Sequence, residues 1–169
     1  HRDFVDGTRV AVNPYVAVDL GQWQVGLSYE YVEDNRVTDR GVPSIAVAGK
    51  PNAPVTGYDE TFFGIPGVND AGLVAHIGKV RVDGQLADNL SASTTLLYAD
   101  YDKFYTNVFP NGAATGQTGT VALAAYTDPT QRQNFIAQSN LLWDFAFGNM
   151  GNKVLLGVEY GNQQSANQR

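Results

Sequence analysis

The chain has no cysteine, one methionine and only two histidines among its 169 residues. The absence of cysteine excludes disulfides, thiolate zinc sites and a cysteine nucleophile. The two histidines, His1 and His76, stand far apart and show no metal-ligand spacing, so the sequence predicts no metal site. Acidic residues outnumber basic ones by 17 to 11, and the net charge of −6 disfavours nucleic-acid binding, which needs a basic face.

Long apolar runs are also missing. The longest, Ile45–Ala48 and Val121–Ala125, are far shorter than the roughly 20 residues of a membrane-spanning helix. The sequence contains no nucleophile elbow, phosphate loop or dinucleotide fingerprint. Gly148–Asn152 is rich in glycine, but no helix follows it, and we interpret it as a turn. The sequence therefore predicts a protein that is not an enzyme.

The chain does have extensive period-two alternation of apolar and polar residues, which is typical of β-strands. Glycine, asparagine, threonine, valine and tyrosine are abundant, and this composition also favours strands and turns. We expect an all-β fold, with the end of one further strand at His1–Asp6. The six antiparallel strands that the alternation predicts are Arg9–Leu20, Gln22–Val32, His76–Leu86, Leu90–Tyr105, Asn134–Phe147 and Lys153–Tyr160.

The connections between these strands alternate in length. Short links are expected at Gly21, Ala87–Asn89 and Gly148–Asn152, and long polar loops at Glu33–Val74, at Asn107–Thr130 and from about Gly161. Bacterial transmembrane barrels keep short turns at one end and long loops at the other. We therefore expect the apolar strand face to meet lipid and the polar face to meet the barrel lumen. Periodicity alone also fits a soluble antiparallel sheet with one buried face.

Several motifs occur in an order that resembles a known family. The motifs are Asp39–Ser44, Phe62–Pro66, Leu97–Tyr105, Asn107–Pro110, Thr130–Asn134 and Leu155–Gly161. Together they are similar to barrel segments of TonB-dependent siderophore receptors, and the resemblance covers nearly the whole chain. The loop signature is most similar to the subgroup that takes up catecholate-type siderophores.

The resemblance implies a bacterial outer-membrane barrel of about 22 strands that is plugged by an N-terminal domain. It implies uptake of a ferric siderophore, driven by the TonB complex through that N-terminal region. Residues 1–169 would then be a partial barrel domain of about six strands, without the plug and the remaining strands. The partners would be the ferric siderophore, the TonB complex and outer-membrane lipid. No cofactor is expected, because the siderophore itself carries the iron.

Loop residues are the candidates for ligand binding. Cationic and aromatic side chains suit ferric siderophores, which are often anionic and expose aromatic or amide surface. The alternative is that these residues pack the loops against each other, as Phe62 and Phe63 suggest most strongly. The candidates are Arg36, Arg40, Tyr58, Phe62, Phe63, Tyr105, Phe109, Tyr126 and Arg132, with Lys50 as a further loop cation.

Charged strand residues have a structural interpretation. Asp100 and Asp102 share a strand face but have no partner for acid–base chemistry, so we expect them where the strand leaves the membrane. A second group is expected to face the lumen: Arg9, Glu30, Lys79, Arg81, Asp83 and Glu159. Two other functions stay open at this point, a passive porin-like barrel and a soluble β-sandwich that binds or cleaves carbohydrate.

Overall fold

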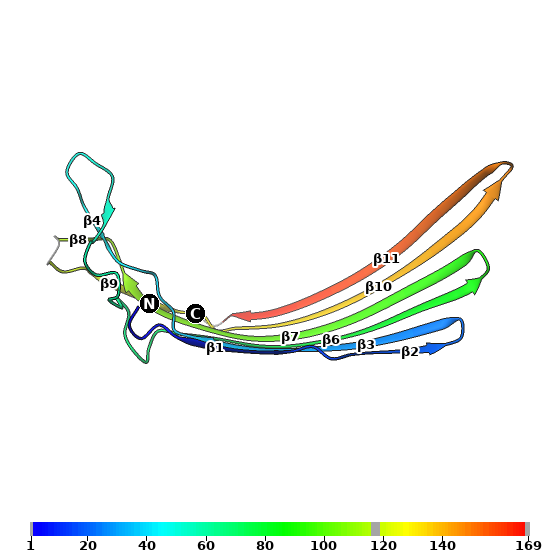
Figure 1. Ribbon diagram of the computed structural model, residues 1–169, viewed down its shortest axis with the longest axis horizontal. Helices are drawn as coiled ribbons and strands as arrows, with labels where there is room; N and C mark the ends of the chain where they lie inside the picture. The colour runs from blue at the N-terminus through cyan, green and yellow to red at the C-terminus, as the bar shows by residue number, and fades with distance from the viewer. Residues whose placement is uncertain (1, 116–118, 168–169) are drawn as a thin grey trace.

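The computed structural model describes residues 2–115 and 119–167. Its main element is one eight-stranded antiparallel sheet, bent lengthwise into a trough (Figure 1). No helix occurs in these two ranges, and therefore none that could cross a membrane. The long strands are β3 (Trp23–Arg36), β6 (Asp70–Ala87), β7 (Leu90–Pro110), β10 (Thr130–Phe147) and β11 (Met150–Asn167), and the shorter ones are β1 (Gly7–Val12), β2 (Tyr15–Leu20) and β9 (Leu123–Thr127).

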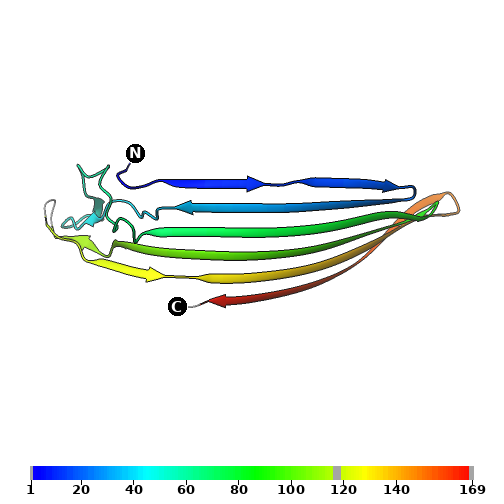
Figure 2. The ribbon, with the colours of Figure 1, turned by 90° about the horizontal axis from the view of Figure 1, so that it is seen from below.

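The strands lie side by side in the order of the sequence, as a series of antiparallel hairpins. Strands β1 and β2 both pair with β3 and form one edge of the sheet, whereas β11 forms the other. Figure 2 shows the two termini on opposite edges, both at the loop end. The described strands do not close into a barrel, because β1 and β11 do not pair. The predicted all-β architecture, a partial barrel wall of six strand positions, is confirmed.

Two predictions about the N-terminal region are wrong. The strand expected over Arg9–Leu20 is interrupted at Asn13–Pro14, which separates β1 from β2. Proline has no N–H for the sheet, so it is tolerated at this edge position and breaks the pairing locally. The strand end expected at His1–Asp6 is also absent from the described part: residues 3 and 4 form a turn, and His1 lies outside the described residues.

Three two-residue turns connect the strands at one end of the trough (Figure 1). They are Gly21–Gln22, Asp88–Asn89 and Gly148–Asn149. Gly21 and Gly148 have φ values of 71° and 60°, a region that glycine enters without steric cost. The expected separation of short turns from long loops is therefore confirmed, although the third turn is shorter than the predicted Gly148–Asn152.

The strands extend further at the loop end than the alternation predicts. β6 begins six residues before His76, and β11 continues to Asn167, where a loop from about Gly161 was expected. Similar extensions lengthen β3, β7 and β10. In these extensions the apolar–polar alternation disappears although the backbone pairing continues. The extensions of β3, β10 and β11 are polar on both faces, whereas that of β6 carries small or apolar residues on both faces after Asp70. A strand boundary predicted from period two therefore marks the end of the alternation and not the end of the strand.

The outer, apolar face of the sheet has no protein partner among the described residues. Phe147, Val158 and Leu156 expose 73%, 69% and 63% of their surface, and the few buried apolar residues of the described chain are all alanine or valine. A water-soluble sandwich would cover such a face with a second sheet. On β10 the band runs from Phe135 to Phe147, roughly 40 Å along the strand and about 31 Å of height at a ~40° tilt. These dimensions fit a bilayer.

The outer face becomes polar one row of paired residues beyond Tyr29, toward the loop end. Directly paired residues there are Tyr31, His76, Asp100 and Gln133, and Asp100 accepts a hydrogen bond of 2.9 Å from Gln133 Nε2. One row higher, the Tyr31 hydroxyl donates to Glu33 Oε2 at 2.6 Å, and this hydrogen bond lowers the pKa of the Glu33 carboxyl. The outer face therefore ends in a row of polar residues at the loop end, where Asp100 and Asp102 were expected.

The opposite face is polar and forms the inside of the trough. The strand register places all six residues expected in the lumen on this face. A hollow of about 790 Å³ near the turns is lined in part by glutamine, asparagine and serine side chains, together with Asp19, Arg81 and Asp83. Every lysine and arginine of the main strands lies on this inner face and none on the outer face: Arg9, Arg36, Lys79, Arg81, Lys103, Arg132 and Lys153.

Candidate ligand-binding site at the loop end

The two long loops are joined by a second, three-stranded sheet on the concave side of the trough (Figure 1). In it, β4 (Ser44–Ile45) pairs antiparallel with β5 (Ala53–Pro54) and parallel with β8 (Ala113–Ala114). Because β4 and β5 belong to the loop after β3, and β8 to the loop after β7, this sheet holds the loops together.

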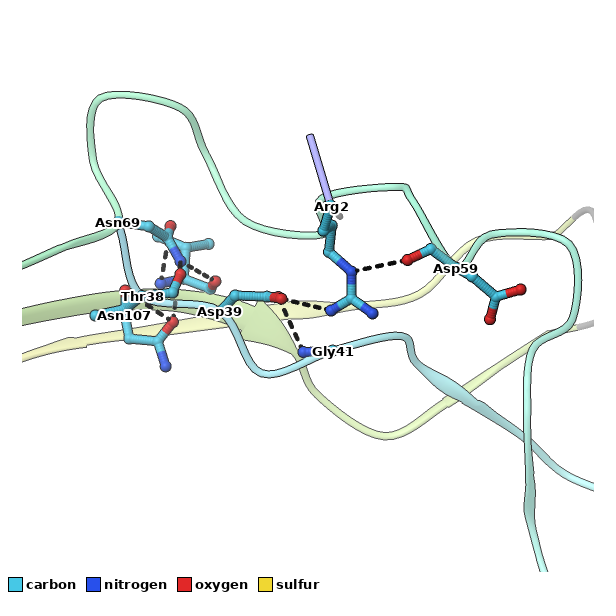
Figure 3. A network of polar contacts seen from close by, with 8 residues as sticks. Arg2, Thr38, Asp39, Gly41, Asp59, Asn69 and Asn107 are labelled. Carbon is cyan, nitrogen blue, oxygen red and sulfur yellow. Dashed lines mark hydrogen bonds and ion pairs between the residues drawn. The ribbon is translucent and has the colours of Figure 1, made fainter. Parts of the chain in front are cut away.

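Asn69, the last residue before β6, anchors the first loop to β7. Its Nδ2 lies 2.9 Å from the Thr38 carbonyl oxygen, 2.8 Å from the Val108 carbonyl oxygen and 3.0 Å from Asn107 Oδ1 (Figure 3). Its Oδ1 accepts the backbone N–H of Ile65 at 2.9 Å. Both the oxygen and the nitrogen of the Asn69 side-chain amide are hydrogen-bonded. This side chain therefore fixes the start of the loop at Thr38 and the end of the loop at Asn69 against β7.

Thr38 and Asn107 complete this buried group. The Thr38 hydroxyl donates to the Thr106 carbonyl oxygen at 2.7 Å. Asn107, Asn69 and Thr38 are 0%, 2% and 6% exposed, which makes them the most buried polar residues of the described chain. Their hydrogen bonds are needed here, because an unpaired polar group in such a position costs about 1–3 kcal/mol. We call Thr38, Asn69 and Asn107 the asparagine latch.

Arg2 makes a second connection within the same loop. Its guanidinium forms a short ion pair with Asp39 and donates from Nε to the Asp59 carbonyl oxygen at 3.1 Å (Figure 3). The other oxygen of Asp39 accepts the backbone N–H of Gly41 at 2.9 Å. The Asp39 side chain thus shapes the turn that follows it and positions Arg40 beside the aromatic residues of β7 and β9.

Arg40 lies over aromatic rings. Its guanidinium carbon is 4.2 Å from the centroid of Phe109 and 5.2 Å from that of Tyr126. Arg40 Nη2 donates to the Tyr126 hydroxyl at 2.6 Å. The rings of Tyr105 and Tyr126 are stacked, with centroids 5.5 Å apart, and Phe109 meets Tyr126 edge-on at 6.0 Å. We call these four residues the Arg40 cluster.

The Arg40 cluster faces the lumen and is coupled to the latch. Tyr105, Asn107 and Phe109 alternate onto the inner face of β7, and Tyr126 on β9 pairs directly with Asn107. Asn107 Nδ2 lies 3.3 Å from the Tyr105 hydroxyl. The same buried asparagine therefore contacts the loop anchor on one side and the aromatic cluster on the other.

A hollow of about 350 Å³ adjoins the cluster, with Arg40 and Phe109 in its wall beside Pro43 and Asn52. Among the described residues Arg40 forms no ion pair with a carboxylate. Its charge is balanced only by aromatic faces and a phenol oxygen, so it remains available to an anion. An exposed cation beside flat rings can bind a ligand that is both anionic and aromatic.

Four of the nine candidate residues thus come together, and five lie elsewhere. Arg36 Nε is 3.4 Å from Asp34 Oδ1 on the inner face of β3. Tyr58 packs edge-on against Phe63, and Phe62 packs on Phe4, with centroids 6.2 and 6.3 Å apart. These contacts have the form of loop packing. Arg132 lies on the inner face of β10, and Lys50 closes a short turn onto Val47.

Sequence reasoning did not identify the asparagine latch, the role of Arg2, or β9. Asparagine normally marks loops and turns, and no local pattern distinguishes the buried Asn107 from the many exposed asparagines. Asp39 followed by glycine two residues later was the one local signal available. Within residues 2–115 and 119–167, no group of three or more His, Cys, Asp or Glu side chains could hold a metal ion.

Comparison with known proteins gives consistent results. No protein-family model matches the chain. The probable TonB-dependent siderophore receptor PiuA of Acinetobacter baumannii is 27% identical over 165 residues, which is 93% of this chain but 22% of that protein. The chain thus spans about a fifth of the length of this curated relative. The resemblance to TonB-dependent siderophore receptors is confirmed, and the relative is named a receptor, not an enzyme.

Solved structures support the fold. The ferric-catecholate import receptor Fiu of E. coli K12 in its open form superposes with a TM-score of 0.82 at 24% identity, over 98% of this chain and 28% of Fiu. The siderophore receptor PiuA of A. baumannii gives 0.81 at 23%, over 98% of this chain and 24% of PiuA. The trough described above is therefore the fold of a segment of such a receptor.

Proposed function

Taking this chain as a segment of the wall of a TonB-dependent siderophore receptor barrel, we propose that it helps to bind and import ferric siderophores across a bacterial outer membrane. The ligand class is catecholate, and the energy comes from the TonB complex through a part of the receptor outside this chain. The iron arrives already chelated, so the barrel wall supplies no ligand to it.

The observation that carries this proposal is the Arg40 cluster. Arg40 and three aromatic rings face the lumen at the loop end, where a ligand from outside would first enter a barrel. A ferric tris-catecholate combines flat rings with a net charge of 3−, because three dianionic catecholates surround Fe³⁺. A cation stacked on aromatic faces suits both properties.

The cations of the sheet are confined to its inner face, which supports an anionic ligand. All lysines and arginines of the main strands lie on this face, whereas the acidic residues Glu33, Asp100 and Asp102 occupy the outer rim. The inner face also carries carboxylates, and the preference for an anion therefore rests on the cations at the loop end, Arg40, Lys103 and Arg132, which form no ion pair among the described residues. The inner-face carboxylates include Glu30, Asp34, Asp83, Asp144 and Glu159.

The test uses a complete receptor that carries this segment, purified in detergent and titrated with a ferric tris-catecholate. We expect quenching of the intrinsic protein fluorescence, and Arg40→Ala should weaken the affinity by about 10-fold, or ~1.4 kcal/mol. Lys153→Ala removes a cation at the opposite end of the same lumen and serves as the matched control. Radioactive iron uptake should also require a functional TonB complex in the cell.

Two results would contradict the proposal. The first is that the receptor binds no ferric siderophore. The second is that iron enters at the same rate with and without TonB, which is the behaviour of a passive pore.

A further inference from the structure

Asn111 and Gly112 connect β7 to β8 at the loop end of the sheet. Asn111 is the one asparagine in the sequence that is followed directly by glycine. Both residues are exposed, and the side-chain amide of Asn111 forms no hydrogen bond within the described residues. Asparagine is a thermolabile residue, because the backbone nitrogen that follows it can attack its side-chain carbonyl carbon. The connection between β7 and β8 is therefore a candidate for chemical modification.

The backbone nitrogen of Gly112 is accessible as the nucleophile for this attack. Glycine has no Cβ, and a Cβ built at Gly112 would meet nothing within 4 Å, so no side chain shields the nitrogen. The N–H of Gly112 donates to no acceptor in the described part of the chain. The other asparagines precede residues with side chains, which hinder the approach of the nitrogen.

The backbone is held on both sides of this pair. The N–H of Asn111 donates to the Ala122 carbonyl oxygen at 2.7 Å, and Ala113 pairs with Ser44 of β4. Between these two attachments, no contact among the described residues holds the Asn111 side chain or the N–H of Gly112. The two reacting groups can therefore approach each other without breaking a hydrogen bond.

We propose that Asn111 is a site of spontaneous deamidation, and that its product weakens the capture of an anion by the Arg40 cluster. The Gly112 nitrogen loses its proton and forms a bond to the side-chain carbonyl carbon of Asn111. The bond from that carbon to the amide nitrogen breaks, and ammonia leaves. Water then opens the succinimide ring at either carbonyl and gives aspartate or isoaspartate. Both products carry a carboxylate in place of a neutral amide, and no oxidant is needed.

The new carboxylate would lie close to Arg40. Pro110 and Gly112, on either side of Asn111, line the same hollow as Arg40. The ring of Phe109, 4.2 Å from the Arg40 guanidinium carbon, belongs to a residue roughly 7 Å before Asn111 along the chain. At that range a negative charge still competes with a ligand for the cation, because screening at physiological salt acts over about 8 Å.

The isoaspartate product has a second effect. It lengthens the backbone directly before β8, whose pairing with β4 holds the two long loops together. Both effects act in the same direction, since one adds repulsion toward an anion and the other loosens the wall of the hollow. The consequence for the ligand rests on the proposed function, whereas the modification itself does not.

Peptide mass spectrometry of a complete receptor, kept in mildly alkaline buffer with detergent, tests the modification. We expect the mass gain of an amide-to-acid exchange at Asn111, at least about 10-fold faster than at Asn149, because Asn149 is also exposed but precedes Met150. Asn111→Gln should abolish the gain, because the longer side chain closes a ring much more slowly. This variant is preferred to Gly112→Ala, since Gly112 has a φ of 93° that alanine rarely adopts.

Titration with a ferric tris-catecholate tests the consequence. Asn111→Asp represents the aspartate product, and its affinity for the trianion should be about 3-fold weaker than that of the wild type. The affinity of the wild type should decline during the incubation as the modified fraction increases. Asn111→Gln is the matched control and should keep its affinity throughout.

The outcomes separate the parts of the proposal. A rate at Asn111 no greater than at Asn149 overturns the modification site. Unchanged affinity in both Asn111→Asp and the aged wild type overturns the effect on capture. A fresh wild-type receptor that binds no ferric tris-catecholate refutes the proposed function instead, while the mass spectra still decide whether Asn111 is modified.

Discussion

Asn69 and Asn107 are 38 residues apart in the sequence, and Nδ2 of Asn69 donates to Oδ1 of Asn107 at 3.0 Å inside the loop end of the sheet. Neither side chain is more than 2% exposed. The bond connects the end of the first long loop to the strand that carries Tyr105 and Phe109. The arrangement of the candidate ligand-binding residues therefore depends on a hydrogen bond between two buried residues that are not themselves candidates for ligand binding.

Asn69→Ala should release this loop. The substitution removes five hydrogen-bond contacts and leaves buried backbone groups unpaired, so we expect a loss of about 1–3 kcal/mol in local stability. Amide hydrogen exchange should accelerate over residues 37–69 and around Val108, but not at the opposite, short-turn end. Asn162→Ala, an exposed asparagine on the outer face of β11, should have no such effect; equal exchange in both variants would argue against the latch.

Gly84 and Gly78 provide a matched pair on the outer face of β6. A Cβ at Gly84 would lie 2.1 Å from a ring carbon of Trp23, whereas a Cβ at Gly78 would meet nothing within 4 Å. Gly84→Ala must therefore displace the indole and should destabilise the folded barrel by about 1–3 kcal/mol. Gly78→Ala should be neutral or stabilising by up to ~1 kcal/mol.

Urea titration of a complete receptor, followed by electrophoretic mobility without heating and by tryptophan emission, measures both changes. Equal midpoints for the two alanine variants would mean that Trp23 does not rest on Gly84.

Arginine substitutions on two adjacent residues of β3 test the lipid face. Val25 points outward and Gln24 inward, where it donates to Asp19 Oδ1 at 2.7 Å. Val25→Arg should cost up to about 2–4 kcal/mol near the membrane midplane, and less toward an interface. Gln24→Arg should be much milder, because the wet lumen solvates the charge. The yield of folded receptor in the outer membrane reports the difference; a larger loss for Gln24→Arg would invert the faces.

The spanning part of this fold follows from the sequence, because lipid and lumen impose opposite polarity on alternate residues. In β3 the outer-face residues Trp23, Val25, Leu27 and Tyr29 are apolar, and the residues between them are polar or glycine. This alternation distinguishes the two faces of the sheet. Above the boundary the alternation of apolar and polar residues is lost, and backbone pairing continues the strands, for example through Gln131 opposite Asp102. Pairing of this kind leaves no side-chain pattern, which is why the predicted strands are too short at the loop end.

The candidate site could be predicted only in part. Residue chemistry identified Arg40, Phe109 and Tyr126, because a cation and aromatic rings on loops suit an anionic ligand. Which loop residues meet each other depends on contacts across 86 residues, such as that between Arg40 and the Tyr126 hydroxyl. No spacing rule encodes those contacts. Whether the nine candidates bind a ligand stays a prediction.

The chain by itself should not behave as a soluble monomer. The described sheet has two unpaired edges, and almost all of β11, Met150–Asn167, is exposed. Open edges of this length pair with other strands. Residues 1–169 expressed alone should form oligomers or aggregates in buffer and should not import a ferric siderophore. Light scattering that shows a monodisperse monomer without detergent would contradict this expectation.

Two adjacent leucines on β11 test the membrane barrel most directly. Leu156 belongs to the outer face and Leu155 to the inner face, and they are 63% and 65% exposed, so side-chain type and exposure are matched. Each is replaced by cysteine in a complete receptor in lipid bilayers and labelled with a fluorophore. Brominated lipid should quench the label at position 156 and not at 155, whose label should respond to a water-soluble quencher or be shielded by the plug. Lipid quenching at 155 but not at 156 would invert the faces, and no lipid quenching at either would refute the barrel.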